Sequence, residues 1–436
     1  MNKLITIFDT IITPAEAVLQ DIEEYGAYVD YNELVKLILD YQVKRDEALK
    51  DLDDMLPATM RGTVNWNSPN QVRELLFDRL KLPIISRTEK GVPQTGKSVL
   101  LRLVDQHPIP GKLLEARKYS KALNGFLNPW KEYLDYEMSM GRPPRLHTTY
   151  NIAKTNTGRL SAEDPNLQQV PRLTGIRSLI CAPPGYVIIE ADYSQIELRI
   201  AAFIARAYSM LDIYNTGGDL HLKTAMATSG LKAEEITKEL RTRAKAVNFG
   251  YIYGMWWKSF KAYAFDNYGV TLTDREAEQS RNDFFKSYPE LTHWHERSKK
   301  YVHTYKYIKS PLGRIRYLPN IDSFDKELRG KAERQAINTP VQSTASDMLL
   351  IALIHVHRTL REENYDAHLI GEVHDSILIE CRSDQAKEVG TLVKRCMEET
   401  VPLVLRNVFS VELDVPIVAD VTIGPGWGQG VDLSEV

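Results

Sequence analysis

Two carboxylates stand where a fold could hold them rigidly for chemistry at a phosphate. Asp192 directly follows the apolar stretch 185–191, GYVIIEA, which predicts a buried strand. Asp375 lies between two further apolar segments, 367–373 and 376–381, which predict two strands joined by a turn. Either acid alone could be an ordinary cap or turn residue. Together, two rigidly placed carboxylates suit a pair of divalent ions about 4 Å apart, the arrangement used for in-line displacement at phosphorus.

A predicted helix over 234–249 carries cations followed by aromatic rings. Arg241, Lys245 and Phe249 are four residues apart, and Tyr253 continues the spacing. At 3.6 residues per turn, these side chains are expected to share one face. A nucleoside triphosphate needs cations for its phosphates and an aromatic surface for its base. We therefore expect this face to bind a nucleotide.

The elements that must position these groups are helices around a small sheet. Apolar residues at helical spacing predict a long helix over 31–56. Ser68, followed by a proline and then Gln71, forms a capping-box pattern that predicts a helix through Leu80. Another helix is expected from Gln195. With the three strands, this pattern predicts the α+β fold class.

Composition places the chain among ordinary globular proteins. Its 436 residues suggest about three domains at roughly 150 residues each. The longest apolar run, near 348–356, is far short of the roughly 20 residues that span a membrane, so no membrane association is predicted. The N-terminus lacks the longer apolar stretch of a signal peptide, and three scattered cysteines suit a reducing compartment without a zinc site. Because the net charge is -3, any nucleic-acid contact requires Lys and Arg gathered on one surface.

Two other motifs have simpler interpretations. Segment 91–98, GVPQTGKS, matches the P-loop of NTPases, but a P-loop follows a buried strand and residues 86–90 are polar and charged. We expect a basic loop that can touch a nucleic-acid backbone. Asp9 resembles the start of a proofreading exonuclease motif, yet Ile11 and Ile12 stand where its acidic partner is expected. Asp9 is therefore predicted to be a surface acid, and no proofreading site is expected.

The motifs, taken in order, resemble family A DNA polymerases of the bacterial and phage DNA polymerase I type. Residues 192–199 (DYSQIELR) are similar to motif A, 241–253 (RTRAKAVNFGYIY) to motif B, and 373–376 (VHDS) to motif C, which usually reads VHDE. The resemblance runs from about Asn67 to Trp427 and so covers most of the chain. Further similar blocks are 155–171, 310–319 and 333–347.

This resemblance implies a right-hand fold of thumb, palm and fingers, with the palm built on a small antiparallel sheet. The basic loop 86–98 would be the DNA-touching tip of the thumb. The expected divisions are the thumb with an N-terminal palm-base segment over 1–155, the first palm segment over 156–205, the fingers over 206–335 and the second palm segment over 336–436.

The resemblance also implies a DNA-templated DNA polymerase that adds deoxynucleotides to a primer 3′ end. Two Mg²⁺ ions, replaceable by Mn²⁺, would be held by Asp192, Asp375 and the backbone carbonyl of Tyr193. Arg241 and Lys245 would grip the triphosphate, with Lys245 placed to protonate the pyrophosphate leaving group. The expected partners are primer-template DNA and deoxynucleoside triphosphates. A cytoplasmic monomer of a bacterial cell or phage-infected host is expected, and the sequence identifies no processivity partner.

The remaining implied roles complete the nucleotide pocket and the DNA surface. Glu197 would close the space beside the sugar 2′ position, with Tyr253, placed where the template enters, as a plausible partner. Arg159 and Gln342 would read the minor-groove face of the primer-terminal pair. The other nucleotide-binding residues would be Phe249, stacking on the nucleotide, His221, meeting the phosphates, and Gln195; the other DNA-binding residues would be Gln168, Arg316, Arg334, Asn338 and, on the primer strand, His374.

Ser376 departs from the family pattern, because a Glu usually follows the motif C Asp. The sequence HDS is similar to single-subunit RNA polymerases, which share the palm. Glu197 and Phe249 favour a DNA polymerase over that alternative. A non-catalytic DNA-binding relative is disfavoured because Asp192 and Asp375 are both present, together with a motif B lysine.

Overall fold

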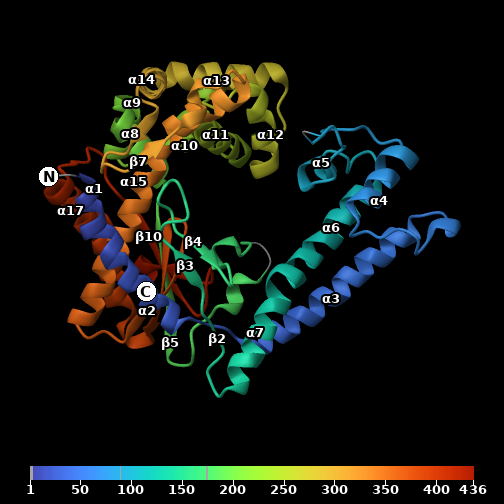
Figure 1. Ribbon diagram of the computed structural model, residues 1–436, viewed down its shortest axis with the longest axis horizontal. Coiled ribbons are helices and arrows are strands. Elements are labelled where there is room, and N and C mark those ends of the chain that lie inside the picture. The colour runs from blue at the N-terminus through green and yellow to red at the C-terminus, as the bar shows by residue number, and fades with distance from the viewer. Residues whose placement is uncertain (1–2, 89, 173–174) are drawn as a thin grey trace. The chain divides into compact units, whose positions relative to one another are not determined.

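The computed structural model describes residues 3–88, 90–172 and 175–436 (Figure 1). Contacts within the chain divide it into two compact units, each with its own core. Unit 1 comprises Met1–Tyr28, His147–Val170 and Ile180–Val436, and unit 2 comprises Val29–Leu146 and Pro171–Leu179.

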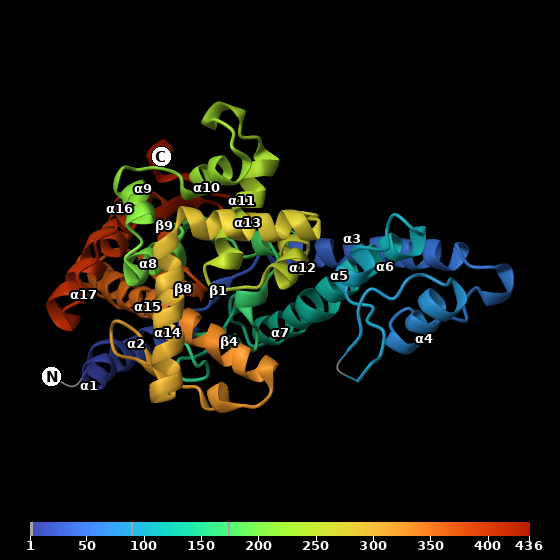
Figure 2. The ribbon, with the colours of Figure 1, turned by 90° about the horizontal axis from the view of Figure 1, so that it is seen from above.

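Unit 2 is built on long helices. The predicted helix over 31–56 is confirmed as α3, which begins where the Asp30 carboxylate accepts a hydrogen bond from the Glu33 backbone N–H at 2.9 Å. Helices α3 and α6 lie side by side in both views (Figures 1 and 2). The helices and the strand of unit 2 are α3 (Tyr31–Asp54), α4 (Pro69–Arg73), α5 (Lys97–Leu101), α6 (Pro108–Ala122), α7 (Asn128–Ser139) and β2 (Arg145–Leu146).

The expected capping box at Ser68 forms only in part. The Ser68 hydroxyl accepts from the Gln71 backbone N–H at 3.5 Å, and α4 continues through a π-helical turn to Arg79. The Gln71 side chain does not return the bond to Ser68; its oxygen accepts from the Asn65 backbone N–H at 2.6 Å. The preceding turn therefore competes successfully for the glutamine.

The P-loop interpretation gains no support from the described part of unit 2. Residues 80–88 contain no strand, only an isolated bridge between Arg87 and Pro93. Helix α5, which follows the glycine-rich segment, is five residues long. One residue of the polar segment, Glu89, lies outside the described residues.

Unit 1 contains a five-stranded antiparallel sheet with the order β11-β10-β5-β9-β8. The predicted strand 185–191 is observed as β5, extended to Tyr193, so Asp192 belongs to the strand. Ile189, Ala191 and Tyr193 alternate into the main core, which leaves Asp192 on the other face. The strands are β5 (Tyr186–Tyr193), β8 (Ala367–Val373), β9 (Ser376–Arg382), β10 (Ala419–Gly424) and β11 (Val431–Asp432).

Helix α15, with 37 residues from Lys326 to Glu362, is the longest element of unit 1 described. The apolar run 348–356 lies in its buried second half, against α2, α8 and β8. None of the described helices is long and apolar enough to cross a membrane. The other helices of this part of unit 1 are α1 (Lys3–Ile7), α2 (Thr13–Tyr25), α8 (Ile196–Ala205), α9 (Tyr208–Asn215), α16 (Ala386–Arg395) and α17 (Val401–Phe409).

A second helical group carries the predicted nucleotide-binding face. The helix expected over 234–249 begins later, at Lys238, because the Thr237 hydroxyl caps it by accepting from the Leu240 backbone N–H at 3.3 Å. This group consists of α10 (Leu220–Ser229), α11 (Lys238–Tyr251), α12 (Trp257–Tyr268), α13 (Asp274–Ser287) and α14 (Pro289–Tyr305).

The short strands of unit 1 are β1 (Ala27–Tyr28), β3 (Thr149–Asn151), β4 (Ser161–Glu163), β6 (Tyr307–Lys309) and β7 (Ile315–Tyr317).

The expected four-residue series does not continue along α11 to Tyr253. The helix ends at Tyr251, and Gly254 adopts φ 76°, a left-handed conformation that glycine tolerates without strain. Its N–H donates to the Tyr251 carbonyl at 2.9 Å, which closes a turn. Tyr253 therefore lies in this turn, and its placement comes from the turn and not from helical periodicity.

Candidate active site

The two acids meet where strand β5 ends and strand β9 begins, a place in unit 1 called the sheet edge below. Register places Asp192 of β5 directly opposite Ser376 of β9, the residue after Asp375. The Tyr193 N–H donates to the Asp375 carbonyl oxygen at 3.1 Å. His374 completes the tight β8–β9 turn in a left-handed conformation with φ 66°. Backbone pairing alone thus fixes the two acids beside each other.

The Asp375 carboxylate is partly exposed, and its pKa lies above the usual value. Burial raises this pKa, and the Arg159 guanidinium, 3.4 Å away, lowers it less than burial raises it. A cation placed between the two acids would replace the solvation that the carboxylates lose.

The donor set suits a hard divalent ion that shares its ligands with a substrate. Among residues 3–88, 90–172 and 175–436, no group of three His, Cys, Asp or Glu side chains is arranged to enclose a metal. Mg²⁺ commonly takes one or two carboxylates and completes its shell with water and substrate phosphates. Asp192 and Asp375 supply such a pair of carboxylates. Ser376, which has no carboxylate, is buried, and its hydroxyl donates to the Val373 carbonyl at 3.1 Å.

A network of three side chains borders Asp375. The Arg159 guanidinium lies 2.5 Å from a Glu197 carboxylate oxygen, and the Tyr253 hydroxyl donates to the other oxygen of Glu197. Burial raises the pKa of Glu197, and Arg159 and Tyr253 only partly offset this. Burial acts to lower the pKa of Arg159, but the Glu197 and Asp375 carboxylates outweigh it and leave that pKa above its usual value. The carboxylate of Glu197 is therefore held in one orientation from two sides.

Arg241, the first cation of the predicted series, already has a partner. Asp219 accepts from the Arg241 guanidinium at 2.8 and 2.9 Å, and also caps α10 by accepting from the His221 backbone N–H at 2.8 Å. Burial acts to raise the pKa of Asp219, but Arg241 and the helix N–H groups leave it below its usual value. Lys245 and Phe249 follow along the same helix, half-exposed. A bound phosphate would have to compete with Asp219 for Arg241.

His221 lies beneath this helix and not at its surface. The ring is buried, and Asn248 donates to its Nδ1 at 2.8 Å while Thr224 donates to the Asn248 carbonyl oxygen at 2.9 Å. Burial lowers the pKa of His221 to about 4, so the ring is neutral near pH 7. Its centroid is 5.9 Å from that of Phe249. Any contact of this ring with phosphates would be that of a neutral hydrogen-bond donor.

Two predicted glutamines are engaged within unit 1. Gln195 precedes α8 in a left-handed conformation and accepts from the Tyr214 hydroxyl at 3.2 Å. Gln168 is buried, donates to the Glu372 carboxylate at 2.7 Å and accepts from the Ala162 N–H at 3.2 Å. Gln168 therefore positions the segment around Arg159 within the protein.

Three predicted DNA contacts recur every four residues along α15. Arg334 is exposed, while Asn338 and Gln342 are partly buried on the same face. The Asn338 side-chain oxygen is buried and has no hydrogen-bond partner within the described parts of the chain. Arg316 joins this region by donating to the Thr339 hydroxyl at 3.0 Å. His374 is exposed at the sheet edge.

Sequence reasoning missed two residues of this site. Asp219 holds Arg241, and Asn248 holds His221. Asp219 directly precedes a helix, and that position was a detectable signal because Asp is a preferred N-cap residue. Asn248 carried no local signal, because its partner is 27 residues away.

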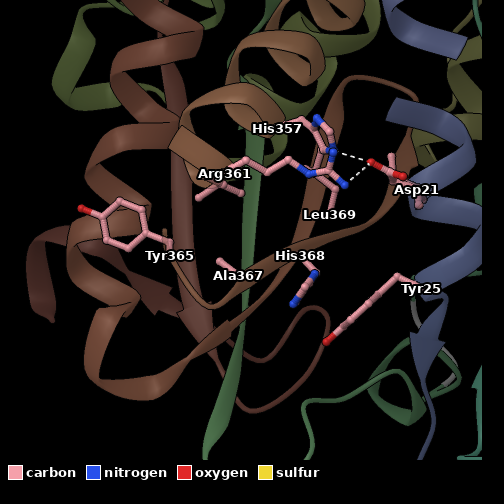
Figure 3. Close-up of a pocket in the computed structure, with 10 residues that line it drawn as sticks. Asp21, Tyr25, His357, Arg361, Tyr365, Ala367, His368 and Leu369 are labelled. Atoms are coloured by element: carbon pink, nitrogen blue, oxygen red, sulfur yellow. Dashed lines mark hydrogen bonds and ion pairs between the residues drawn. The ribbon is translucent and has the colours of Figure 1, made fainter. Parts of the chain in front are cut away.

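A pocket of about 130 Å³ lies on other elements of unit 1, between α2, α15 and β8 (Figure 3). Asp21 accepts from His357 and Arg361, each at 2.7 Å, and Tyr25 stacks on His368 with centroids 4.0 Å apart. None of the predicted site residues lines this pocket. Its charged groups are satisfied by one another.

The comparison with known families identifies the family of the chain. The family described as DNA polymerase family A matches residues 36–429. The chain belongs to DNA polymerase family A. This confirms the resemblance drawn from motifs A, B and C. Members of this family use divalent metal ions, in keeping with the paired acids.

Relatives in family A come from bacteria and from a phage. DNA polymerase I of Caldicellulosiruptor bescii is 33% identical over 98% of this chain and 48% of its own length. DNA polymerase I of Pseudomonas aeruginosa is 34% identical over 98% of this chain and 45% of its own. A DNA polymerase of Bacillus phage SP01 is 35% identical over 86% of this chain and 41% of its own. The chain spans about half the length of the curated relatives it matches.

A solved structure confirms the fold class. The POL domain of Pol1 from M. smegmatis, in complex with DNA primer-template and dNTP, is similar with a TM-score of 0.85 and 28% identity. The match covers 97% of this chain and 71% of that one. The α+β right-hand polymerase fold predicted from the motifs is thus the fold of the chain.

Proposed function

We propose that this chain is a DNA-templated DNA polymerase that extends a primer 3′ end with deoxynucleoside triphosphates. The observation that carries the proposal is the meeting of Asp192 and Asp375 at one sheet edge, beside the Arg159–Glu197–Tyr253 network. Family membership and the DNA and nucleotide in the similar solved structure support it.

The proposed reaction is attack of the primer 3′ hydroxyl on the α-phosphate, with release of pyrophosphate. Asp192 and Asp375, with the Tyr193 carbonyl, would hold two Mg²⁺ ions, for which Mn²⁺ can substitute. When bound, these ions supply charge stabilisation to the attacking and leaving oxygens. Lys245 would donate a proton to the leaving pyrophosphate.

Binding of the triphosphate would draw on α11. Arg241 would leave Asp219 for the phosphates, since a phosphate offers more charge than one carboxylate. Phe249 would stack on the base, and Gln195 and the neutral His221 would complete the pocket. This exchange couples nucleotide binding to a change of partner at the start of α11.

Sugar choice would depend on Glu197. Arg159 and Tyr253 fix its carboxylate from two sides, so a 2′ hydroxyl would meet an oxygen that cannot easily move. Discrimination then comes from penalising the wrong substrate. Arg159 would then have two roles: it would hold Glu197, and together with Gln342 it would contact the minor groove of the DNA.

The DNA duplex would lie along α15 and the sheet edge. Arg334, Asn338 and Gln342 share one face of that helix, and the unpartnered Asn338 oxygen suits a donor from a base or sugar. The other proposed contacts are Gln168, Arg316 and His374, of which Gln168 would act through the protein segment it positions.

We also propose that residues 1–155 form the thumb together with an N-terminal palm-base segment, that 156–205 and 336–436 form the palm, that 206–335 form the fingers, and that the protein is a monomer. In this division, the loop at 86–98 would be the tip of the thumb that touches DNA. A protease that cuts near this loop only without primer-template DNA would support the placement.

Primer extension tests the proposed function directly. The purified chain, a primed DNA template, Mg²⁺ and deoxynucleotides should give extended primers, whereas ribonucleotides should be used poorly. Ser376, shared with single-subunit RNA polymerases, supports the competing RNA-synthesis hypothesis. Equal use of matched dATP and ATP would favour that hypothesis, and no extension with either would contradict both.

A further inference from the structure

Four tyrosines of unit 1 form a continuous aromatic surface, here called the tyrosine surface. Tyr301 and Tyr305 come from the last turns of α14, Tyr307 from β6 and Tyr317 from β7. Their ring centroids are 4.6 Å apart for Tyr301–Tyr305, 5.8 Å for Tyr301–Tyr307 and 5.9 Å for Tyr307–Tyr317. The β6–β7 hairpin packs against α15.

Folding accounts for only part of this cluster. Tyr307 and Tyr317 are cross-strand partners, and such aromatic pairs stabilise a short hairpin. The opposite face of β6 supplies Ile308 to a small core with Val302. Tyr317, however, is 71% exposed and Tyr305 is 54% exposed. These two rings present most of their area to solvent, where burial gives little stability.

The segment that carries the tyrosine surface is strongly basic. Residues 297–334 contain eleven Lys or Arg and four Asp or Glu, a surplus of seven positive charges in a chain of net charge -3. One of these cations, Arg314, is paired with the buried Asp347 outside this segment. Lys309 lies on the same hairpin face as Tyr307 and Tyr317, with its ammonium 5.3 Å from the Tyr307 ring centroid. Rings interleaved with cations are the features that bind single-stranded nucleic acid, through base stacking and phosphate contacts.

The exposed rings and the positive charge together indicate which ligand the tyrosine surface binds. A duplex keeps its bases stacked inside, so exposed rings would gain little from it. An apolar protein partner would gain little from a segment with such an excess of positive charge. An unpaired strand offers both free base faces and phosphates.

We propose that the tyrosine surface binds the unpaired template strand, with bases stacking on Tyr305 and Tyr317 and with Lys309 contacting the phosphates. The inference rests on the proposed function, because the unpaired strand held by a primer-extending enzyme is the template ahead of the primer. The hairpin is joined to the proposed duplex surface, since Arg316 of β7 donates to Thr339 on α15.

The test compares two primer-templates that differ in their 5′ template overhang. One overhang has two nucleotides and the other has twelve deoxythymidines; a third has twelve abasic sites, which keep the phosphates and remove the bases. Dissociation constants are measured for wild type, Tyr305→Ser/Tyr317→Ser, Tyr305→Leu/Tyr317→Leu and Tyr305→Phe/Tyr317→Phe. Tyr208→Ser is the control, because Tyr208 is 66% exposed on another helix.

Wild type should bind the thymidine overhang about tenfold more tightly than the short one, given that stacking on one ring contributes up to a few kcal/mol per base. The Ser and Leu variants should lose most of this preference, and the Phe variant and Tyr208→Ser should keep it. Abasic overhangs, which keep only the phosphate contacts, should show a small part of it. Extension on the short overhang should continue in every variant.

Several results would overturn the inference. One is that wild type binds all overhangs equally, or binds abasic and thymidine overhangs equally. Another is that the Ser variant keeps the full preference for the thymidine overhang, or that the Phe variant loses that preference as well. If wild type extends primers but shows no overhang preference, this inference fails alone. If wild type fails to extend the short-overhang substrate, the proposed function fails.

Discussion

The sheet edge and helix α11 hold their functional groups in different ways. Asp192 and Asp375 are placed by strand register and by a backbone hydrogen bond, so neither acid can move without breaking the ladder. Arg241 is held by one ion pair to a partly exposed carboxylate. Groups that stabilise the transition state gain from fixed positions, whereas groups that admit and release a substrate need exchangeable partners.

Replacing either sheet-edge acid should have the largest effect. Asp192→Asn or Asp375→Asn should lower the rate of primer extension by at least about a hundredfold, because a fixed charge that acts in the transition state is lost. Affinity for primer-template DNA, measured by fluorescence anisotropy, should change little. Asp420→Asn is a matched control, since Asp420 of β10 is the cross-strand neighbour of Asp192 of β5 and is exposed. Near-normal extension by either variant would remove that acid from the mechanism.

Loosening the network beside the acids should change selectivity more than rate. Glu197→Ala should lower the preference for dATP over ATP, measured as a ratio of kcat/KM, by about tenfold or more, in line with loss of a repulsive contact. Tyr253→Phe keeps the ring and removes one of the two bonds that fix Glu197, so its effect should be smaller. An unchanged ratio in both variants would show that Glu197 does not select the sugar.

Burial of His295 against the turn after α11 should make the stability of the protein depend on pH. The ring lies 2.9 Å from the Ile252 carbonyl, and burial lowers its pKa from 6.5 to about 4. Since the unfolded chain takes up this proton first, the contribution is present above pH 6.5 and is lost as the pH falls toward 4.

His295→Gln can keep a bond to Ile252 and cannot be protonated. Between pH 6.5 and 4, wild type should lose stability relative to this variant by up to about 1.4 kcal/mol per pH unit. Urea unfolding of both proteins at several pH values measures the difference. A constant difference across this range would contradict a neutral His295.

The smallest effect is expected at the ion pair between Arg241 and Asp219. Asp219→Asn keeps a good N-cap for α10 and removes the charge that holds Arg241. The KM for deoxynucleotides should fall a few-fold at most, because partly exposed ion pairs contribute about 0.2–1 kcal/mol. Steady-state kinetics on a short overhang give this value. A large rise in KM would mean that Asp219 supports the nucleotide pocket directly.

The parts that sequence predicted correctly are those that local chemistry determines. Strands around Asp192 and Asp375 followed from apolar runs, and their turn followed from two polar residues between strands. The start of α11 was misplaced, because Thr237 is a better cap than the residues before it. Tyr253 was placed on the helix since spacing cannot show that Gly254 ends it in a turn.

Contacts between distant segments were beyond local reasoning. Arg159 is 38 residues from Glu197 and 216 from Asp375, and Gln168 is 204 from Glu372. Motif resemblance suggested what these residues do with DNA, but their partners within the protein depend on how the segments pack. The buried environment of His221 was missed for the same reason.

The uneven distribution of charge along the chain has a practical consequence. A surplus of seven positive charges within residues 297–334 leaves -10 on the rest of a chain whose total is -3. The charge is thus distributed unevenly along the chain, and column retention depends on a local basic patch as well as on the total charge. The protein should therefore bind a cation-exchange resin at low ionic strength near neutral pH, and it should approach a polyanion with this segment leading.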